Sequence, residues 1–398
     1  MYLKLQNRTY YLLSLILVQL FYVAPLELLS QKDRCHYSHS SENLPSTEDF
    51  RTERRNSESI CVVFHILQTA EEEQISDERI QSQMDRINND FQRVGEDLSL
   101  IPELFQVDIG TSNFNFVLAD TDPDGFPSTG IVRIQTDLQN IGSLISQDGK
   151  EVIKFSSLGG SDAWSPDSCI NVWVGVTTDV FGVTAPLDLA GTAEDGIIIT
   201  PEAFGLIENP IIPGTELGRT LTHELGHYFG LEHLWGSNIG CDEGDGIEDT
   251  PQQEGPYVNC PDFPQVSCGS ADMHNNFMDF TDDDCLLFFT RGQVQRMRAV
   301  LEEVRSGVIV ANDDLPSAPE LSFEIRQSDE GLDIVHDNKA SRFARVSIYT
   351  TTGQLIMTEQ INSINVHRIN TNNWPRAVYI LSIRDVDRRF THTFIAGS

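Results

Sequence analysis

The sequence predicts an α/β domain followed by a small all-β domain. Short apolar segments rich in β-branched residues are interleaved with longer segments whose apolar residues recur at helical spacing, as in α/β proteins. After a linker at residues 313–319 the cysteines disappear, and short segments of alternating polar and apolar residues continue to the C-terminus. We therefore expect a larger domain at residues 59–312 and a β-sandwich at residues 320–398.

The larger domain has predicted strands and helices in mixed order. Apolar, β-rich segments predict strands at residues 61–67, 114–119, 131–136, 170–176 and 196–200. Apolar residues at helical spacing predict helices at residues 74–94, 215–230 and 290–305. The middle helix contains the residues that carry the chemistry.

The N-terminus has the pattern of an export signal. Lys4 and Arg8 precede an apolar run, Tyr10–Leu26, which is short for a membrane span and contains Gln19. Residues 1–30 are predicted to be a cleaved signal peptide, the alternative being an uncleaved anchor. The mature protein is then expected to be secreted into an oxidising environment, in which disulfides form.

A polar leader follows at residues 31–58, which we interpret as a propeptide. Its basic segment RTERRNS ends at residue 57, and the Arg54–Arg55 bond is the expected processing point. The leader also contains one cysteine, Cys35. Beyond the signal region no apolar stretch is long enough to span a bilayer, so no stable membrane span is expected.

Net charge restricts the partners. The chain has 60 acidic and 27 basic residues, a formal charge of −33, which argues against nucleic acid and anionic membranes as partners. Metal ions and basic peptides are favoured instead. We expect a monomer that acts on peptide or protein substrates.

The segment THELGHYFGLEHLWG, residues 222–236, is the most informative in the chain. His223 and His227 are four residues apart, so one helix face presents both imidazoles to one metal. Gly230 allows the chain to turn, and His233 then arrives as a third ligand. Three histidines leave a position open for water, as in catalytic zinc sites, and Glu224 is placed to accept the proton of that water.

A methionine downstream completes this pattern. The extended motif H-E-x-x-H-x-x-G-x-x-H with a later Met-turn is the signature of metzincin zinc proteases. Met278, in NNFMDFTDDDC at residues 275–285, is the Met-turn candidate. The alternative is that Met278 is an ordinary core methionine.

Several motifs together resemble the pappalysin (cytophagalysin) family of metzincin metalloendopeptidases. The resemblance covers residues 59–305 and rests on GRTLTHELGHYFGLEHLWG, on DTP at 249–251, and on NNFMDFTDDDC followed by FTRGQVQRM. It implies a metzincin-type catalytic domain with a mixed, mostly parallel sheet, an active-site helix and an irregular lower lobe. It also implies zinc ligation by three histidines, general base catalysis by a glutamate and a Met-turn, carried by His223, His227, His233, Glu224 and Met278.

One position departs from the family pattern. Two residues after the Met-turn methionine these proteins usually have Tyr, and this chain has Phe280. Phenylalanine cannot donate a hydrogen bond to a developing oxyanion, which is expected to lower the rate. The alternatives to an active zinc endopeptidase are therefore a weakened, metzincin-scaffold binding protein and a zinc hydrolase acting on another bond. The intact Glu224 argues against a pure binding protein.

Four of the seven cysteines lie within residues 241–285. Their spacings of 19, 8 and 17 residues lack the close C-x₂₋₄-C pair of a zinc site, so export favours disulfides. The spacing leaves three pairings open, and the family resemblance implies Cys241–Cys268 and Cys260–Cys285. Cys61 and Cys169 are either buried thiols or a further pair.

Cys35 in the leader has two interpretations. In the first, the Cys35 thiolate occupies the open zinc position and keeps the enzyme latent, as in a cysteine switch. In the second, Cys35 is an unpaired cysteine without a role.

Two acidic groups complete the predicted site. The segment 241–251 offers hard oxygen ligands for Ca²⁺, namely Asp242, Asp245, Asp249 and the carbonyl of Thr250; the alternative is a solvated acidic loop. In metzincins the segment after the Met-turn forms the wall of the S1′ pocket. Asp283 is placed there and would attract Arg or Lys at P1′.

The C-terminal region resembles the type IX secretion sorting domain. The matching parts are VSIYTTTGQLI at 346–356 and INTNNWPRAVYILSI at 369–383, although Ala377 replaces the usual Gly. The resemblance implies that secretion machinery is a partner and that the protein is secreted or held at the cell surface. The alternative is a small adhesive or carbohydrate-binding sandwich.

Overall fold

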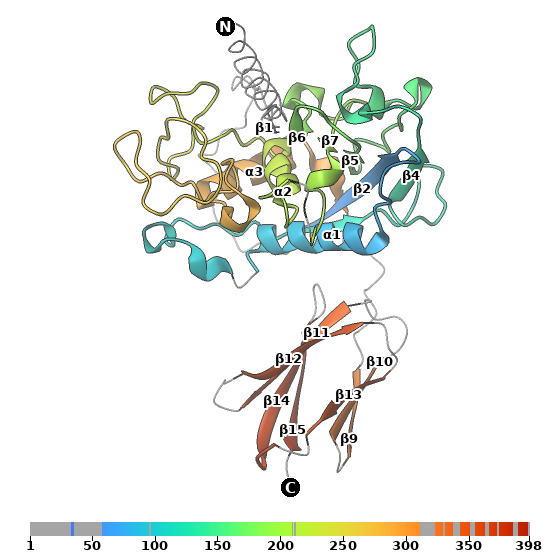
Figure 1. The fold of residues 1–398 in the computed structure, drawn as a ribbon, viewed down its shortest axis with the longest axis vertical. Coiled ribbons are helices and arrows are strands. Elements are labelled where there is room, and N and C mark those ends of the chain that lie inside the picture. Colours follow the sequence, from blue (N-terminus) through green and yellow to red (C-terminus); the bar gives the residue numbers. More distant parts are fainter. Residues whose placement is uncertain are drawn as a thin grey trace, which may run out of the picture. The chain divides into compact units, whose positions relative to one another are not determined.

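A computed structural model shows two compact units, Met1–Ile309 and Val310–Ser398 (Figure 1). In the first unit it describes residues 33–35, 58–94, 97–208, 210 and 212–309. In the second it describes residues 310, 323–328, 331–336, 343–350, 355–362, 366–371, 374–384 and 389–396. The predicted signal peptide and the Arg54–Arg55 processing point lie outside these residues.

The first unit is built on a mixed, mostly parallel sheet, as the family resemblance implied. Its strand order is β1-β6-β7-β5-β2-β3, and β4 and β8 also pair with β2. The strands are β1 Asp33–Cys35, β2 Glu58–Gln68, β3 Phe114–Leu118, β4 Ile131–Gln135, β5 Ile170–Val174, β6 Val180–Thr184, β7 Ile197–Ile199 and β8 Ile309–Val310. Strand β2 is parallel to β3, β4 and β5, whereas β6 is antiparallel to β7.

Three α-helices accompany the sheet in the described part of this unit: α1 Asp77–Gln92, α2 Arg219–Tyr228 and α3 Arg291–Glu303. Helix α1 begins after Ser76, whose side chain accepts a hydrogen bond from the backbone N–H of Arg79, and its periodic apolar residues are buried. Helix α2 begins at Arg219 rather than near Thr215, because Gly218 takes the left-handed conformation (φ 71°) directly before it.

Strands β1 and β6 were not predicted. The sequence of β6, VFGVT, is short and has glycine at its centre, which weakens the strand signal. Strand β1 lies in the polar leader and pairs in parallel with β6, with Cys35 opposite Gly182. The edge strand β6 and the leader strand therefore lie side by side, and both contribute to the site described below.

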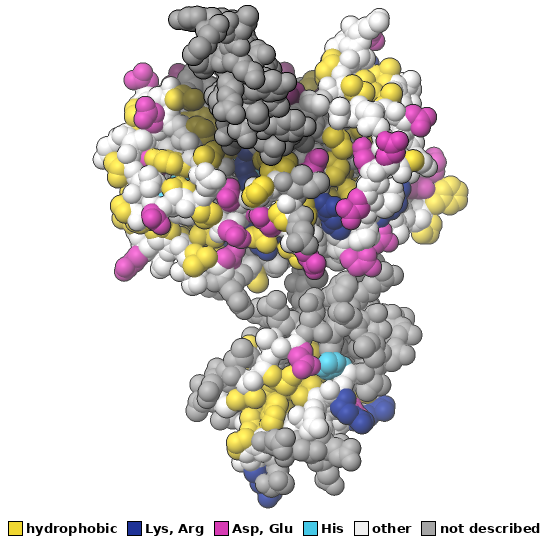
Figure 2. Space-filling view, in the orientation of Figure 1, with side chains coloured by type: hydrophobic (Ala, Val, Ile, Leu, Met, Phe, Trp, Pro, Cys, Tyr) yellow, Lys and Arg dark blue, Asp and Glu magenta, His cyan; other side chains and the backbone are white. Residues whose placement is uncertain are grey.

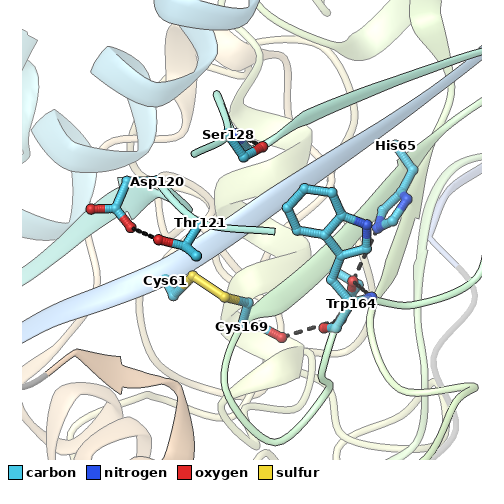
Figure 3. The surroundings of a disulfide bond; sticks show 9 residues. Cys61, His65, Asp120, Thr121, Ser128, Trp164 and Cys169 are labelled. Atoms are coloured by element: carbon cyan, nitrogen blue, oxygen red, sulfur yellow. Dashed lines mark hydrogen bonds between the residues drawn. A yellow bond between two sulfur atoms is a disulfide. The ribbon is translucent and has the colours of Figure 1, made fainter. Parts of the chain in front are cut away.

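Three disulfides fasten the first unit. Cys241–Cys268 and Cys260–Cys285 form as the family resemblance implied. The open question about Cys61 and Cys169 is answered by a third disulfide, which joins β2 to the residue before β5 (Figure 3). Nearby, the buried His65 ring is held between the Ser161 hydroxyl at 2.8 Å and the Asn171 side-chain oxygen at 3.0 Å.

The second unit is all-β, as predicted. One sheet has the order β13-β10-β9 and the other β12-β11-β14-β15, with antiparallel neighbours throughout. The strands are β9 Phe323–Ser328, β10 Gly331–His336, β11 Phe343–Thr350, β12 Leu355–Asn362, β13 Val366–Asn370, β14 Ala377–Arg384 and β15 Arg389–Ala396. Inward residues of both sheets share one apolar core, which includes Leu332, Ile334, Val346, Ile348, Leu381 and Ile383.

The surface agrees with the charge balance. On the face shown in Figure 2, acidic side chains are spread over the first unit and outnumber the basic ones, consistent with the formal charge of −33. Within the described residues, no helix has both the length and the apolar character needed to cross a membrane.

Candidate metal centre

The three histidines of the motif converge on one point. Helix α2 carries His223 and His227, and Gly230 (φ 80°) turns the chain so that His233 faces both. Nε2 of His227 lies 3.1 Å from Nε2 of each partner, and the remaining Nε2–Nε2 distance is 3.3 Å. Three nitrogens about 2.0–2.1 Å from a tetrahedral zinc are separated by similar distances, so the donor set fits this metal.

Backbone carbonyl groups orient two of these rings. Nδ1 of His223 lies 2.7 Å from the Phe277 carbonyl oxygen, and Nδ1 of His227 lies 2.8 Å from the Leu231 carbonyl oxygen. When each Nδ1–H donates to its carbonyl, Nε2 is left unprotonated to bind a metal. Burial, followed by the charges of neighbouring groups, holds the pKa of His223 well below its usual value, which keeps the ring neutral.

Glu224 lies beside the ligands and is fully buried. Its Oε2 accepts a hydrogen bond of 2.7 Å from the hydroxyl of Thr184 on β6. Burial raises the pKa of Glu224 to about 7 against the opposing effect of this hydrogen bond. A carboxyl group with a pKa near neutrality is suited to accept and return a proton.

Cys35 joins the histidine cluster. Among the described residues, one group of His, Cys, Asp or Glu places at least three possible metal-binding atoms close together, and it consists of Cys35 with the three histidines, within 4.8 Å of one another. Cys35 is buried and unpaired. Burial, and next the Glu224 carboxylate, raise the pKa of its thiol well above the usual value.

The residue before Cys35 reaches a second predicted site residue. Nη2 of Arg34 lies 3.0 Å from Oδ1 of Asp283, and both side chains are buried. Oδ2 of Asp283 accepts hydrogen bonds from the backbone N–H groups of Leu217 and Arg219 at the start of α2. Sequence reasoning missed Arg34, for which the only available signal was its position next to Cys35.

Met278 lies under the ligand helix. It is fully buried, and a Cβ atom added at Gly226 would lie 2.4 Å from its Sδ, so the glycine is needed for this close approach. Phe280 has its ring centroid 4.9 Å from that of His233 and 5.7 Å from that of His223. Trp235, which sequence reasoning also missed, stacks on His233 at 4.6 Å.

The three predicted aspartate ligands of calcium do not form one cluster among the described residues. Both Asp249 oxygens are engaged at the start of α3, one by the Thr290 hydroxyl at 2.7 Å and the other by the Gly292 N–H at 2.8 Å. Asp245 accepts a hydrogen bond of 2.6 Å from the Thr250 hydroxyl, and Asp242 is exposed. One Asp245 oxygen, Oδ2, is buried without a hydrogen-bond partner among the described residues.

Two sequence families match the chain. The pattern described as pregnancy-associated plasma protein-A matches residues 160–302, and that of the secretion system C-terminal sorting domain matches residues 328–396. The second match confirms the predicted secretion-sorting domain and argues against a small adhesive or carbohydrate-binding sandwich.

Solved structures of mirolysin from Tannerella forsythia are similar to the first unit. Mature mirolysin in complex with a cleaved peptide is 33% identical with a TM-score of 0.61, over 66% of this chain and 98% of that chain. A promirolysin mutant is 35% identical with a TM-score of 0.57, over 64% of this chain and 83% of that chain.

Curated relatives share a shorter region. An extracellular metalloprotease of Arthroderma otae is 37% identical over 109 residues, which are 26% of this chain and 40% of that protein. One from Aspergillus fumigatus is 44% identical over 96 residues, which are 23% of this chain and 29% of that protein. The chain thus spans less than half the length of these fungal relatives. Its match to almost all of mature mirolysin, with the three histidines in place, shows that it belongs to the pregnancy-associated plasma protein-A (pappalysin) family of metalloproteases and carries a secretion-sorting domain.

Proposed function

We propose that this protein is a secreted zinc endopeptidase that is made in a latent form. The observation that carries the proposal is the convergence of three oriented Nε2 atoms beside the buried carboxylate of Glu224. A donor set of three neutral imidazoles is typical of catalytic zinc.

The chain's own residues divide the reaction between them. His223, His227 and His233 would hold zinc, which supplies a Lewis acid for the peptide carbonyl and lowers the pKa of water. Glu224 takes the proton from the attacking water and returns it to the nitrogen of the leaving amine. Phe280 cannot donate a hydrogen bond to the developing oxyanion, so stabilisation of that charge falls on other groups.

The edge of strand β6 is the proposed place for an extended substrate. In the described structure this edge is occupied by β1 of the leader, paired in parallel. Once the leader is removed, the backbone groups of β6 are free to pair with an extended peptide, a common mode of peptide recognition.

Asp283 supports a preference for Arg or Lys at P1′. The carboxylate is buried near the ligand helix and already pairs with an arginine, Arg34 of the leader. A cationic substrate side chain can take the place of Arg34, because a buried carboxylate favours a charged and hydrogen-bonded partner.

Cys35 supports latency by a cysteine switch. Its sulfur lies among the three zinc ligands, where it would occupy the position that water needs. Zinc stabilises a thiolate strongly, and this opposes the rise of the Cys35 pKa caused by burial. Arg34 and Cys35 thus block two parts of the site at once.

Calcium binding in the segment 241–251 stays a proposal with narrower support. It rests on the acidic character of the segment and on the unpartnered Oδ2 of Asp245. Since Asp249 is already engaged at the start of α3, it is the least available of the four predicted ligands.

The second unit is proposed to engage secretion machinery, as its family match suggests. It has no part in the proposed chemistry. Action as a monomer stays a prediction.

The test is cleavage of a mixed peptide library by the zinc-loaded protein after its leader has been removed by limited proteolysis at the Arg54–Arg55 bond, with mass-spectrometric mapping of the cut sites. Cuts that are absent in the Glu224→Ala version of the same protein establish the endopeptidase. Stoichiometric zinc without cuts would contradict the proposal and favour the weakened, binding-protein alternative marked by Phe280.

A further inference from the structure

Strand β6 turns two residues toward the ligand helix. Side chains alternate across a strand, so Gly182 and Thr184 share one face and Val183 lies on the other. Val183 packs with a separate apolar cluster that includes Trp173 and Ile198. Gly182 and Thr184 both contact Glu224 of α2.

Thr184 binds Glu224 at two atoms. Its hydroxyl lies 2.7 Å from Oε2 of the carboxylate and 2.9 Å from the Glu224 backbone oxygen. A hydroxyl has one proton, which these two acceptors share. Because Thr184 is 2% exposed and Glu224 is fully buried, bulk water does not compete for this contact.

Gly182 closes the other side of the carboxylate. A Cβ atom at this position would lie 2.7 Å from both Cγ and Oε1 of Glu224. The carboxylate therefore packs directly against the backbone of β6. The terminal torsion of a glutamate is otherwise broad, so contacts of this kind decide where each oxygen points.

We propose that Thr184 is a positioning residue for Glu224: by binding Oε2, its hydroxyl orients the carboxylate so that Oε1 is the oxygen left to take the proton of water. The proposal rests on the general-base role given to Glu224 under the proposed function. In the latent form the Cys35 thiol lies close to the same carboxylate. Oε1 of Glu224 is buried without a hydrogen-bond partner among the described residues.

The test compares threonine variants of the zinc-loaded protein after the leader has been removed by limited proteolysis at the Arg54–Arg55 bond. Thr184→Val keeps the shape and removes the hydroxyl, whereas Thr184→Ser keeps the hydroxyl. Thr220→Val is the matched control, since Thr220 is a buried threonine of α2 whose hydroxyl has no hydrogen-bond partner among the described residues. Glu224→Gln reports on the underlying mechanism.

We expect Thr184→Val to lower kcat roughly tenfold or more, as loss of a hydrogen bond to a charged group implies. KM, zinc content and the melting temperature should change little. Thr184→Ser should restore at least half of kcat, and Thr220→Val should match the parent. A crystal structure of zinc-loaded Thr184→Val should show the Glu224 carboxylate in a changed or divided orientation.

Other results would overturn the inference. A parental kcat in Thr184→Val, an equal loss in Thr184→Ser, or a loss of zinc in Thr184→Val would show that the hydroxyl does not position the base. If Thr184→Val does not fold, Thr184→Ala, which adds no methyl group beside the carboxylate, must show the same loss of kcat. Activity in Glu224→Gln would instead defeat the proposed mechanism itself, so the two failures are distinguishable.

Discussion

Arg34 and Asp283 form a buried ion pair, with Nη2 of the arginine 3.0 Å from Oδ1 of the aspartate, although 249 residues separate them in the chain. Along the leader, Arg34, which pairs with Asp283, comes before Cys35, which lies at the three histidines. In a substrate the order of the two groups is the reverse, because the P1′ residue comes after the carbonyl that is attacked. The leader thus offers a basic side chain to Asp283 while presenting a thiol, not a scissile carbonyl, to the three histidines.

Replacing Asp283 by Asn should remove the preference for a basic P1′ residue. Without its charge the pocket no longer compensates a buried guanidinium, so kcat/KM for a peptide with Arg at P1′ should fall roughly thirtyfold or more. The matched peptide with Leu at P1′ should be cleaved as before or better. Measuring kcat/KM for both peptides checks this, and an equal fall for both would show that Asp283 acts only on stability.

Releasing the leader contacts one at a time should activate the full chain. In Cys35→Ala the thiol no longer blocks the zinc ligands, and in Arg34→Ala the Asp283 pocket is open. We expect each variant to cleave peptides faster than the unprocessed parent, and the double variant fastest. The measurement is the initial rate before any processing, checked by mass. Latency unchanged in the double variant would show that the leader does not inhibit through these residues.

The cluster of three histidines was predictable because its signal is local. The two helical histidines, Glu224 and His233 lie within eleven consecutive residues, so helix geometry and one turn at Gly230 fix their arrangement. The remaining site residues come together only through the sheet. Thr184 reaches Glu224 because β6 lies beside α2, and Arg34 reaches Asp283 because β1 pairs with β6.

The acidic segment shows a different limit of sequence reasoning. Asp249 was grouped with Asp245 because both lie in one charged loop. Its oxygens instead bind Thr290 and Gly292, where a carboxylate compensates the free N–H groups at the start of α3. Composition cannot distinguish a helix-capping aspartate from a metal ligand, since the partner is 41 residues away.

Removing the third ligand should separate metal binding from folding. His233 follows the helix and contributes its side chain to the cluster, so His233→Ala should lose most of its zinc and its activity. The fold should persist, because the core below α2 does not depend on this side chain. Zinc content by elemental analysis and far-ultraviolet circular dichroism check the two parts. Full zinc occupancy in this variant would refute the proposed ligand set.

Calcium should stabilise the first unit more at alkaline than at acidic pH if Asp245 is a ligand. Burial raises the pKa of Asp245 to about 7, so the neutral form prevails below that pH and competes with the cation. The rise of melting temperature on adding Ca²⁺ should therefore be larger at about pH 8 than at about pH 6. Asp245→Asn should abolish the difference, and Mg²⁺ serves as the control ion. No calcium response at either pH would leave the segment as a solvated loop.

The Cys61–Cys169 disulfide should contribute more stability than Cys241–Cys268. The first closes a segment of 108 residues and the second one of 27, so the first restricts the unfolded chain more. Replacing both cysteines of the longer link by alanine should cost about 2–4 kcal/mol of unfolding free energy, about 1 kcal/mol more than the same change in the shorter link. Chemical denaturation of the two double variants, each with zinc content measured, makes the comparison. Neither change touches a zinc ligand, so a loss of zinc would mean that the link shapes the site. An equal loss of stability would show that strain or packing, rather than loop length, decides the contribution.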